Sequence, residues 1–226
     1  VVANFNELID TYAEDEYKEK WKVSIQDGSV TFGSAKDRWA INVDIMKKKG
    51  VTFKDVIDAY SDSGKVEDLV EKAPLAEGVL GMVVKHHPPP HVAQKYRIPK
   101  IWKGDLESDT GKALLACDDD GPTIMMCVNM TIDPAAGPVA IGRLFSGKIK
   151  DGQTINIIDT KREGRVQSVN FFMSNVREQV GELGAGNIPA LLGLTDVRAG
   201  QTISTVKDIP VFEASKYVSE PVVQMA

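Results

Sequence analysis

The stretch Pro138–Asp159, PVAIGRLFSGKIKDGQTINIID, holds two candidate strands separated by turn signals. The segments Val139–Phe145 and Gln153–Asp159 follow a period of two, which is typical of β-strands. Between them, Ser146-Gly147 and Asp151-Gly152 supply the residue types that tight turns need. The stretch therefore predicts short strands joined by tight turns.

The same pattern continues on both sides of this stretch. Further candidate strands are Thr123–Ile132, Arg165–Phe172, Ile188–Leu192 and Thr202–Val206. The turn signals between strands include Asp133-Pro134 with Gly137, then Gly164, Gly184 with Gly186, and Ala199-Gly200. About six short strands with regularly spaced turns predict a closed or nearly closed β-barrel.

The beginning of the chain has a different pattern. Phe5, Leu8, Ile9 and Tyr12 have the spacing of one helix face, with Asn4 as the expected cap. A hairpin is predicted next, from Val23 to Phe32 around an Asp27-Gly28 turn.

Three further helices are expected before the barrel. Thr52 and Asp55 form a capping-box pattern ahead of the first, Val66–Val70 indicate the second, and Leu75–Val83 the third. The prolines Pro88–Pro90 favour an extended path, so we expect a domain boundary there.

Composition limits the class of protein. The chain has 226 residues, 42% apolar and 26% charged, as in a soluble globular protein. It has no apolar run long enough to span a membrane and no secretory signal, and its two cysteines favour a reducing cytoplasm. The net charge of −5 argues against a general nucleic-acid coat, although Lys85–Lys103 and Pro138–Arg165 are locally basic. We therefore expect a cytoplasmic protein that binds neither membranes nor DNA.

Several short motifs are better explained structurally. The histidines His86, His87 and His91 match no standard zinc spacing, so no metal site is predicted. Asp118–Gly121 contains a D-x-x-G pattern of GTPases, but it follows no phosphate loop, and an acidic turn is the better interpretation. The sequence has neither a G-x-x-x-x-G-K-[ST] loop nor an Asn-Lys-x-Asp motif, so no catalytic residue is predicted.

Longer motifs carry a family resemblance. These are Gly28–Ala35 followed by Trp39-Ala40, the joint Pro88–Pro99, Gly142–Gly147, Ala185–Ile188 and Ala199–Ile203. Together they resemble the archaeal elongation factor 2 family, the GTP-driven ribosomal translocases that move tRNA and mRNA. The resemblance covers essentially the whole chain.

The resemblance implies a fold and a domain order. It implies an α+β multi-domain fragment: the incomplete C-terminal part of a doubly wound α/β GTPase domain, then a six-stranded translation-factor β-barrel. The implied ranges are 1–84 for the GTPase part, 85–104 for a linker, 105–215 for the barrel and 216–226 for a linker towards a third domain.

The resemblance also implies ligands and partners. Gly33, Ser34 and Ala35 are the expected guanine-recognition residues, with backbone N–H groups at Ser34 and Ala35 meeting the base. In the intact protein we expect GTP or GDP with magnesium as cofactors and small-subunit ribosomal RNA as partner, with the protein a monomer. The fragment alone is expected to be inactive and to bind no nucleotide tightly. The candidate RNA contacts are basic residues near barrel turns: Arg143, Lys148, Lys161, Arg162 and Arg165.

Two alternatives remain at this stage. One is a ribosome-assembly or initiation GTPase with the same pair of domains. The other is a free-standing barrel that binds RNA or protein. The basic stretch Lys85–Lys103 favours this alternative.

Overall fold

The chain divides into two compact units, Val1–His87 and Pro88–Ala226. The computed structural model describes residues 1–61, 64–174 and 176–213. The predicted linker at 216–226 lies outside the described residues.

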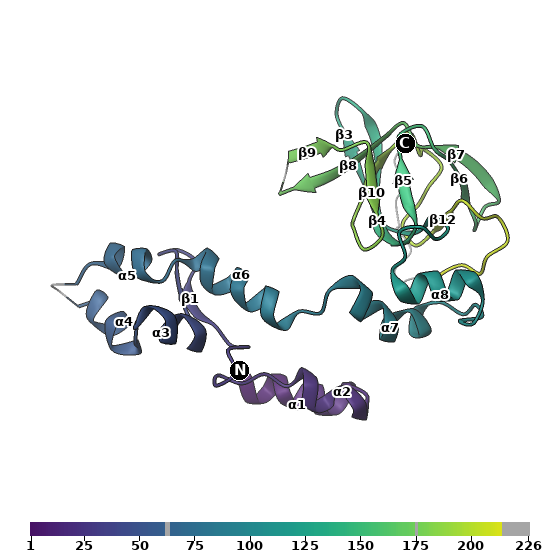
Figure 1. The fold of residues 1–226 in the computed structure, drawn as a ribbon. Coiled ribbons are helices and arrows are strands. Elements are labelled where there is room, and N and C mark those ends of the chain that lie inside the picture. The colour runs from purple at the N-terminus through teal and green to yellow at the C-terminus, as the bar shows by residue number, and fades with distance from the viewer. Residues whose placement is uncertain (62–63, 175, 214–226) are drawn as a thin grey trace, which may run out of the picture. The chain divides into compact units, whose positions relative to one another are not determined.

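The first unit consists of short helices and one strand pair (Figure 1). Its helices are α1 (Val2–Tyr12), α2 (Asp15–Trp21), α3 (Val43–Lys49), α4 (Phe53–Ala59), α5 (Val66–Lys72) and α6 (Leu75–His86). Its strands are β1 (Phe32–Ser34) and β2 (Trp39–Ile41), which pair antiparallel.

The helices predicted from apolar spacing are confirmed as α1, α4, α5 and α6. The capping box before α4 is also confirmed, since the Thr52 hydroxyl accepts the Asp55 N–H while the Asp55 carboxylate accepts the Thr52 N–H. The core of this unit gathers around β2, where Trp39 and Ile41 pack with Ile45 of α3 and Leu69 of α5.

Two predictions in this unit are wrong. Helix α1 begins after Val1, so Asn4 lies inside the helix rather than capping it. No strand forms at Val23, because local bonds replace the ladder there: the Ser24 N–H donates to the Ser29 hydroxyl (2.8 Å) and the Ser29 N–H to Asp27 (2.8 Å). The observed hairpin lies further along, with β1 and β2 as its strands.

The second unit begins with two helices and continues as a β-structure. The helices are α7 (Pro90–Ile101) and α8 (Asp109–Ala116). The longer strands are β3 (Ile124–Asp133), β4 (Gly137–Ser146) and β8 (Ser168–Met173). The shorter ones are β5 (Lys148–Lys150), β6 (Thr154–Ile157), β7 (Arg162–Arg165), β9 (Val176–Gln179), β10 (Glu182–Gly184), β11 (Ala190–Leu192) and β12 (Thr202–Ser204).

Most strands join one antiparallel sheet. Among the described residues it is eight-stranded, in the order β7-β6-β12-β3-β4-β11-β8-β9, and β10 pairs separately with β5. The six predicted strands correspond to β3, β4, β6, β8, β11 and β12. The pairings recorded for the described part of the chain do not close this sheet on itself.

The strand limits required two corrections. Gly164 was predicted as a turn but lies in β7, where it pairs with Ile155, and a Cβ on it would lie 2.9 Å from Leu194 Cδ2. The predicted strand Arg165–Phe172 is broken, because Val166 and Gln167 leave β7 to bond with Gln153 and Leu192 instead.

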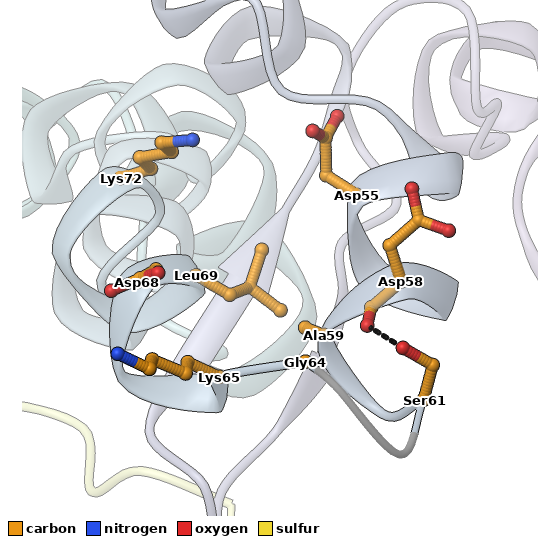
Figure 2. A pocket seen from close by; sticks show the side chains of 9 residues that line it. All are labelled: Asp55, Asp58, Ala59, Ser61, Gly64, Lys65, Asp68, Leu69 and Lys72. Atoms are coloured by element: carbon orange, nitrogen blue, oxygen red, sulfur yellow. Dashed lines mark hydrogen bonds between the residues drawn. The ribbon is translucent and has the colours of Figure 1, made fainter.

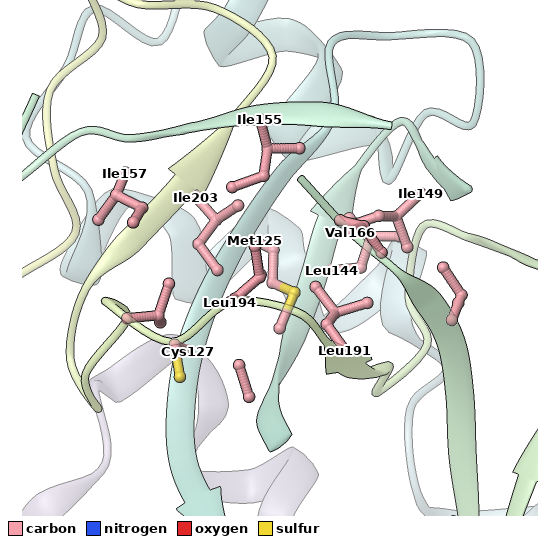
Figure 3. Close-up of a cluster of buried hydrophobic side chains, with 13 residues drawn as sticks. Met125, Cys127, Leu144, Ile149, Ile155, Ile157, Val166, Leu191, Leu194 and Ile203 are labelled. Carbon is pink, nitrogen blue, oxygen red and sulfur yellow. The ribbon is translucent and has the colours of Figure 1, made fainter. Parts of the chain in front are cut away.

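The main core lies inside this β-structure. Figure 3 shows Met125 of β3, Leu144 of β4, Leu191 of β11 and Ile203 of β12 directed into one interior, and all four are fully buried. Complete burial of one such side chain is worth about 1.5–3 kcal/mol.

Helices α7 and α8 form a second layer against β3 and β4. Ile98, Trp102 and Leu114 from the helices pack with Ile124 and Phe145 from the strands. The segment predicted as an extended linker therefore contains a packed helix. Pro90 does not prevent it, because a proline at the first helical position has no N–H to lose.

No helix within residues 1–61, 64–174 and 176–213 has both the length and the apolar character needed to cross a membrane.

Candidate functional site

The predicted guanine-recognition residues lie at the β1–β2 hairpin. Gly33 and Ser34 end β1, and Ala35 opens the turn that leads to β2. A side chain at Gly33 would collide with the opposite strand, since its Cβ would lie 2.7 Å from the Trp39 carbonyl oxygen. Glycine therefore allows β1 to approach β2 closely at this point.

A hydrogen-bond network fixes the turn that follows. The Ser34 hydroxyl donates to the Asp37 carboxylate (2.8 Å) and accepts the Asp37 N–H (3.1 Å). From α4's end, Tyr60 donates its hydroxyl to the same carboxylate, while the Trp39 indole N–H donates to the Tyr60 oxygen (2.9 Å). The hydrogen bond from Tyr60 is the main cause that lowers the pKa of the Asp37 carboxyl group, and the bond from Ser34 lowers this pKa further. The Ser34 side chain is thus used within the turn, and Ala35 is exposed at its tip.

A hollow of about 540 Å³ adjoins this turn. It is lined by Lys36, Asp37 and Arg38 of the turn, and by Val66 and Val70 of α5 among others. A ligand that met the turn could therefore extend into a space with both charged and apolar walls.

A second hollow, of about 450 Å³, lies between α4 and α5 (Figure 2). Its acidic side chains include Asp55, whose carboxylate accepts the Thr52 N–H (2.7 Å) in the capping box. Lys65 and Lys72 stand on the α5 side of the same hollow. Asp55 therefore has a structural role in the cap of α4, and this hollow is not the space beside the predicted guanine loop.

Three of the predicted RNA-contact residues share one place. Lys161 precedes β7, and Arg162 and Arg165 lie on it. All three are exposed. Arg162 pairs with Asp196 (3.4 Å), and the Arg165 Nε–H donates to the Gly152 carbonyl (3.2 Å).

The other two lie elsewhere in the second unit. Lys148 is on β5 and stands 3.6 Å from the Asp120 carboxylate. Arg143 is in the middle of β4 rather than at a turn, and it is half-buried. Burial is the main cause that lowers the pKa of the Arg143 guanidinium, and the positive charge of Arg97 lowers this pKa further. The five residues therefore do not form one continuous basic surface.

The D-x-x-G pattern is an acidic turn, as its sequence context indicated. The Asp118 carbonyl accepts the Gly147 N–H (2.7 Å), and the Asp119 carboxylate accepts the Ala185 N–H (2.7 Å). These bonds join the end of α8 to two strand turns. In the described part of the chain, no three histidine, cysteine or acidic side chains gather as a metal site.

Comparison with known proteins finds relatives that are similar over both units. The chain is 79% identical over all 226 residues to elongation factor 2 of Cenarchaeum symbiosum. It is 47% identical over 232 aligned residues to elongation factor 2 of Sulfurisphaera tokodaii and 48% identical over 227 to that of Methanocaldococcus jannaschii. The resemblance to archaeal elongation factor 2 is confirmed. The chain spans about a third of the length of these relatives, 31–32%.

A family model described as elongation factor Tu domain 2 matches residues 137–204. This range runs from β4 to β12 and leaves α7, α8 and β3 outside the match. The similarity to elongation factor 2 extends over them, however, because it covers 100% of the chain.

Sequence reasoning missed one candidate residue, Arg97 of α7, which acts on Arg143 electrostatically. It lies in the basic stretch Lys85–Lys103, but only the packing of α7 against the sheet shows which cation of that stretch lies near Arg143.

Proposed function

We propose that the chain is part of a GTP-dependent ribosomal translocase, which moves tRNA and mRNA during elongation. The observation that carries this proposal is the 79% identity over the full chain to a protein named elongation factor 2. The identity includes both units, so it is not limited to a β-structure that many translation factors could share.

In this proposal, residues 1–84 are the end of a doubly wound GTPase domain. Gly33, Ser34 and Ala35 meet the guanine base, with Ser34 and Ala35 using backbone N–H groups. The close approach at Gly33 and the exposure of Ala35 support this role. GTP or GDP with magnesium binds the intact protein, whereas this chain, which lacks a phosphate loop, binds nucleotide weakly at most and hydrolyses none.

The second unit would be the six-stranded translation-factor barrel, predicted at 105–215, that contacts small-subunit ribosomal RNA. The exposed group at β7 is the best-supported contact, because Lys161, Arg162 and Arg165 are exposed within five consecutive residues there. Such cations position a protein on phosphates without reading sequence. The intact protein would work as a monomer in the cytoplasm.

The test uses an intact protein that contains this chain. We expect ribosome-stimulated GTP hydrolysis, and movement of mRNA by one codon in a toeprinting assay. Reversing Lys161 and Arg165 to glutamate should weaken ribosome binding and flatten its salt dependence, with nucleotide affinity off the ribosome unchanged. Arg198→Glu is the matched control, since Arg198 is also an exposed arginine of the second unit.

GTP hydrolysis without codon movement would contradict the translocase proposal and favour an assembly or initiation GTPase. Unchanged ribosome binding at low salt would contradict only the role of β7.

A further inference from the structure

The region where α7, α8 and β4 meet holds two arginines that the contacts described so far do not explain. Successive side chains of a strand point to opposite faces. Leu144 belongs to the main core of the β-structure, so Arg143 and Phe145 point to the other face, and Phe145 there packs with Ile98 of α7 and Leu114 of α8. Arg143 therefore projects into the layer of the helices.

A buried glutamine fixes α7 against this face. Gln94 is 2% exposed, and its Nε2 donates to the Phe145 carbonyl (2.9 Å) and to the Leu114 carbonyl. Arg97 follows three residues later and immediately precedes buried Ile98, so it borders the buried face of the helix. The bond to Phe145 thus sets Arg97 beside the segment of β4 that carries Arg143.

The neighbouring turn completes this corner. Gly186 has a φ of 82°, and a Cβ there would lie 2.9 Å from Pro90 Cβ and 3.1 Å from Cys117 Sγ. The first residue of α7, the end of α8 and the turn after β10 are therefore in contact. The Gln94–Phe145 bond brings the turn of α7 that carries Arg97 to the strand that carries Arg143, and the contacts at Gly186 place the start of α7 and Cys117 at the same corner.

Neither guanidinium has a protein partner among the residues that the structure describes. Within residues 1–61, 64–174 and 176–213, Arg97 and Arg143 make no ion pair and no side-chain hydrogen bond. The acidic residue Asp119 influences Cys117 at this corner, but its carboxylate already accepts the Ala185 N–H (2.7 Å). A half-buried guanidinium with five donors and a second cation beside it is unfavourable unless an anion balances them.

We propose that Arg97 and Arg143 form a binding site for a phosphate group. A guanidinium binds oxyanions through two parallel hydrogen bonds, and a phosphate has enough oxygens to accept such bonds from two arginines at once. A carboxylate has only two oxygens, which one arginine can occupy. The residues around Arg97 also favour a multiply charged ligand, since Lys85–Lys103 contains lysine and arginine and no aspartate or glutamate.

The phosphate could belong to an RNA backbone or to a small molecule such as a mononucleotide, and both sources present the same chemistry to the pair. The site is separate from the β7 group and from the guanine loop. It does not depend on the proposed translocase activity, because it concerns the second unit alone.

The test is an NMR titration of the 226-residue chain. The probes are inorganic phosphate, AMP, a ten-nucleotide oligouridine, and acetate at matched ionic strength. The Arg97 and Arg143 Nε–H signals should shift with the three phosphate probes and saturate. Arg97→Gln should weaken phosphate binding by about tenfold, as expected for a lost charged hydrogen bond, and Arg143→Lys should weaken it although the charge is kept.

Arg198→Gln is the matched control, because it removes the same charge from an exposed position in the same unit and should change the affinity by less than about twofold. Tighter binding of oligouridine than of AMP would support an RNA backbone as the source, and equal binding a small phosphate.

Three results would overturn the proposal: no shift with any phosphate probe, equal loss in Arg198→Gln, or acetate as effective as phosphate. The last would assign the pair to a protein carboxylate. The Trp102 indole N–H signal reports whether the helix layer is folded. If Arg143→Lys loses this signal, the test rests on Arg97→Gln alone, because Arg97 is exposed and its substitution should leave the fold intact.

Discussion

Replacing Gln94 with methionine tests how α7 is held to the β-structure. The Gln94 amide donates to a carbonyl at the end of α8 and to one on β4, so the substitution leaves the Leu114 and Phe145 oxygens without this donor. A buried acceptor that loses its partner costs about 1–3 kcal/mol. Methionine keeps nearly the same volume, so little cavity energy is added.

One opposing contribution reduces the expected loss. The Gln94 Oε1 atom is buried with no hydrogen-bond partner among the described residues, and methionine removes it. Relief of that atom recovers about 1–3 kcal/mol. The substitution leaves two buried carbonyl oxygens without their donor and removes one buried oxygen that has no partner. We therefore expect a net loss of about 1–3 kcal/mol in the free energy of unfolding of the second unit.

The assay follows the Trp102 indole N–H signal through a urea titration. Trp102 is 2% exposed and donates to the Pro210 carbonyl (2.8 Å), so its signal reports the folded layer of the helices. Gln167→Met is the control, because Gln167 is an exposed glutamine of the same unit. A loss no greater than that of the control would refute the reasoning and show that water or a shift of α7 satisfies both carbonyls.

Three further predictions concern single sites. Gly186→Ala should lower the free energy of unfolding in urea by at least about 1–2 kcal/mol, whereas Gly137→Ala should cost only the backbone strain, because Gly137 also has a positive φ but a Cβ there would meet no atom within 4 Å. Equal losses for the two variants would contradict the crowding at the α7–α8 corner. Burial raises the pKa of the Cys127 thiol from 9.0 to about 11, so the stability that comes from keeping this thiol neutral should be lost as the pH rises from about 9 to 11. A maleimide at pH 8 should label Cys117 before Cys127, and rapid labelling of Cys127 in the folded chain would count against its burial. Thr52→Ala removes the α4 capping box and should lower the stability of the first unit by about 1 kcal/mol, measured by hydrogen exchange in α4, and unchanged exchange would show that the cap is dispensable.

Local rules predicted those elements whose stability comes from nearby residues. The α4 cap lies within four residues, and the strands of the second unit keep a period of two because one face of the sheet packs into the main core. The β1–β2 hairpin was misplaced because the Asp27-Gly28 turn exists, but serine side chains take up the backbone groups that a ladder would need. A turn signal alone therefore does not predict the strands on either side of it.

The candidate site divides in the same way. Gly33, Ser34 and Ala35 could be predicted as candidates because their motif is continuous in the sequence, and their role stays a prediction. Arg97 and Arg143 could not be paired, because only the packing of Gln94 against β4 brings α7 to that strand. An unpaired cation gives no signal in a single sequence, whereas in the structure the absence of an acid among the described neighbours of Arg143 is itself informative.

The burial of β4 on both faces leads to a last prediction, about where the second unit can be cut. Leu144 packs inside the sheet and Phe145 packs outside it, so the sheet needs a covering layer, which α7 and α8 provide. A chain that starts at residue 105 keeps α8 but loses Ile98 and Trp102, and each fully buried side chain of this kind is worth about 1.5–3 kcal/mol. That loss is comparable with the total stability of a small domain, about 5–15 kcal/mol. Residues 88–213 should therefore unfold cooperatively, while residues 105–213 should unfold at clearly lower urea or bind a hydrophobic dye. Equal midpoints for the two chains would mean that the sheet is stable without α7, and that the predicted boundary at 105 is the physical one.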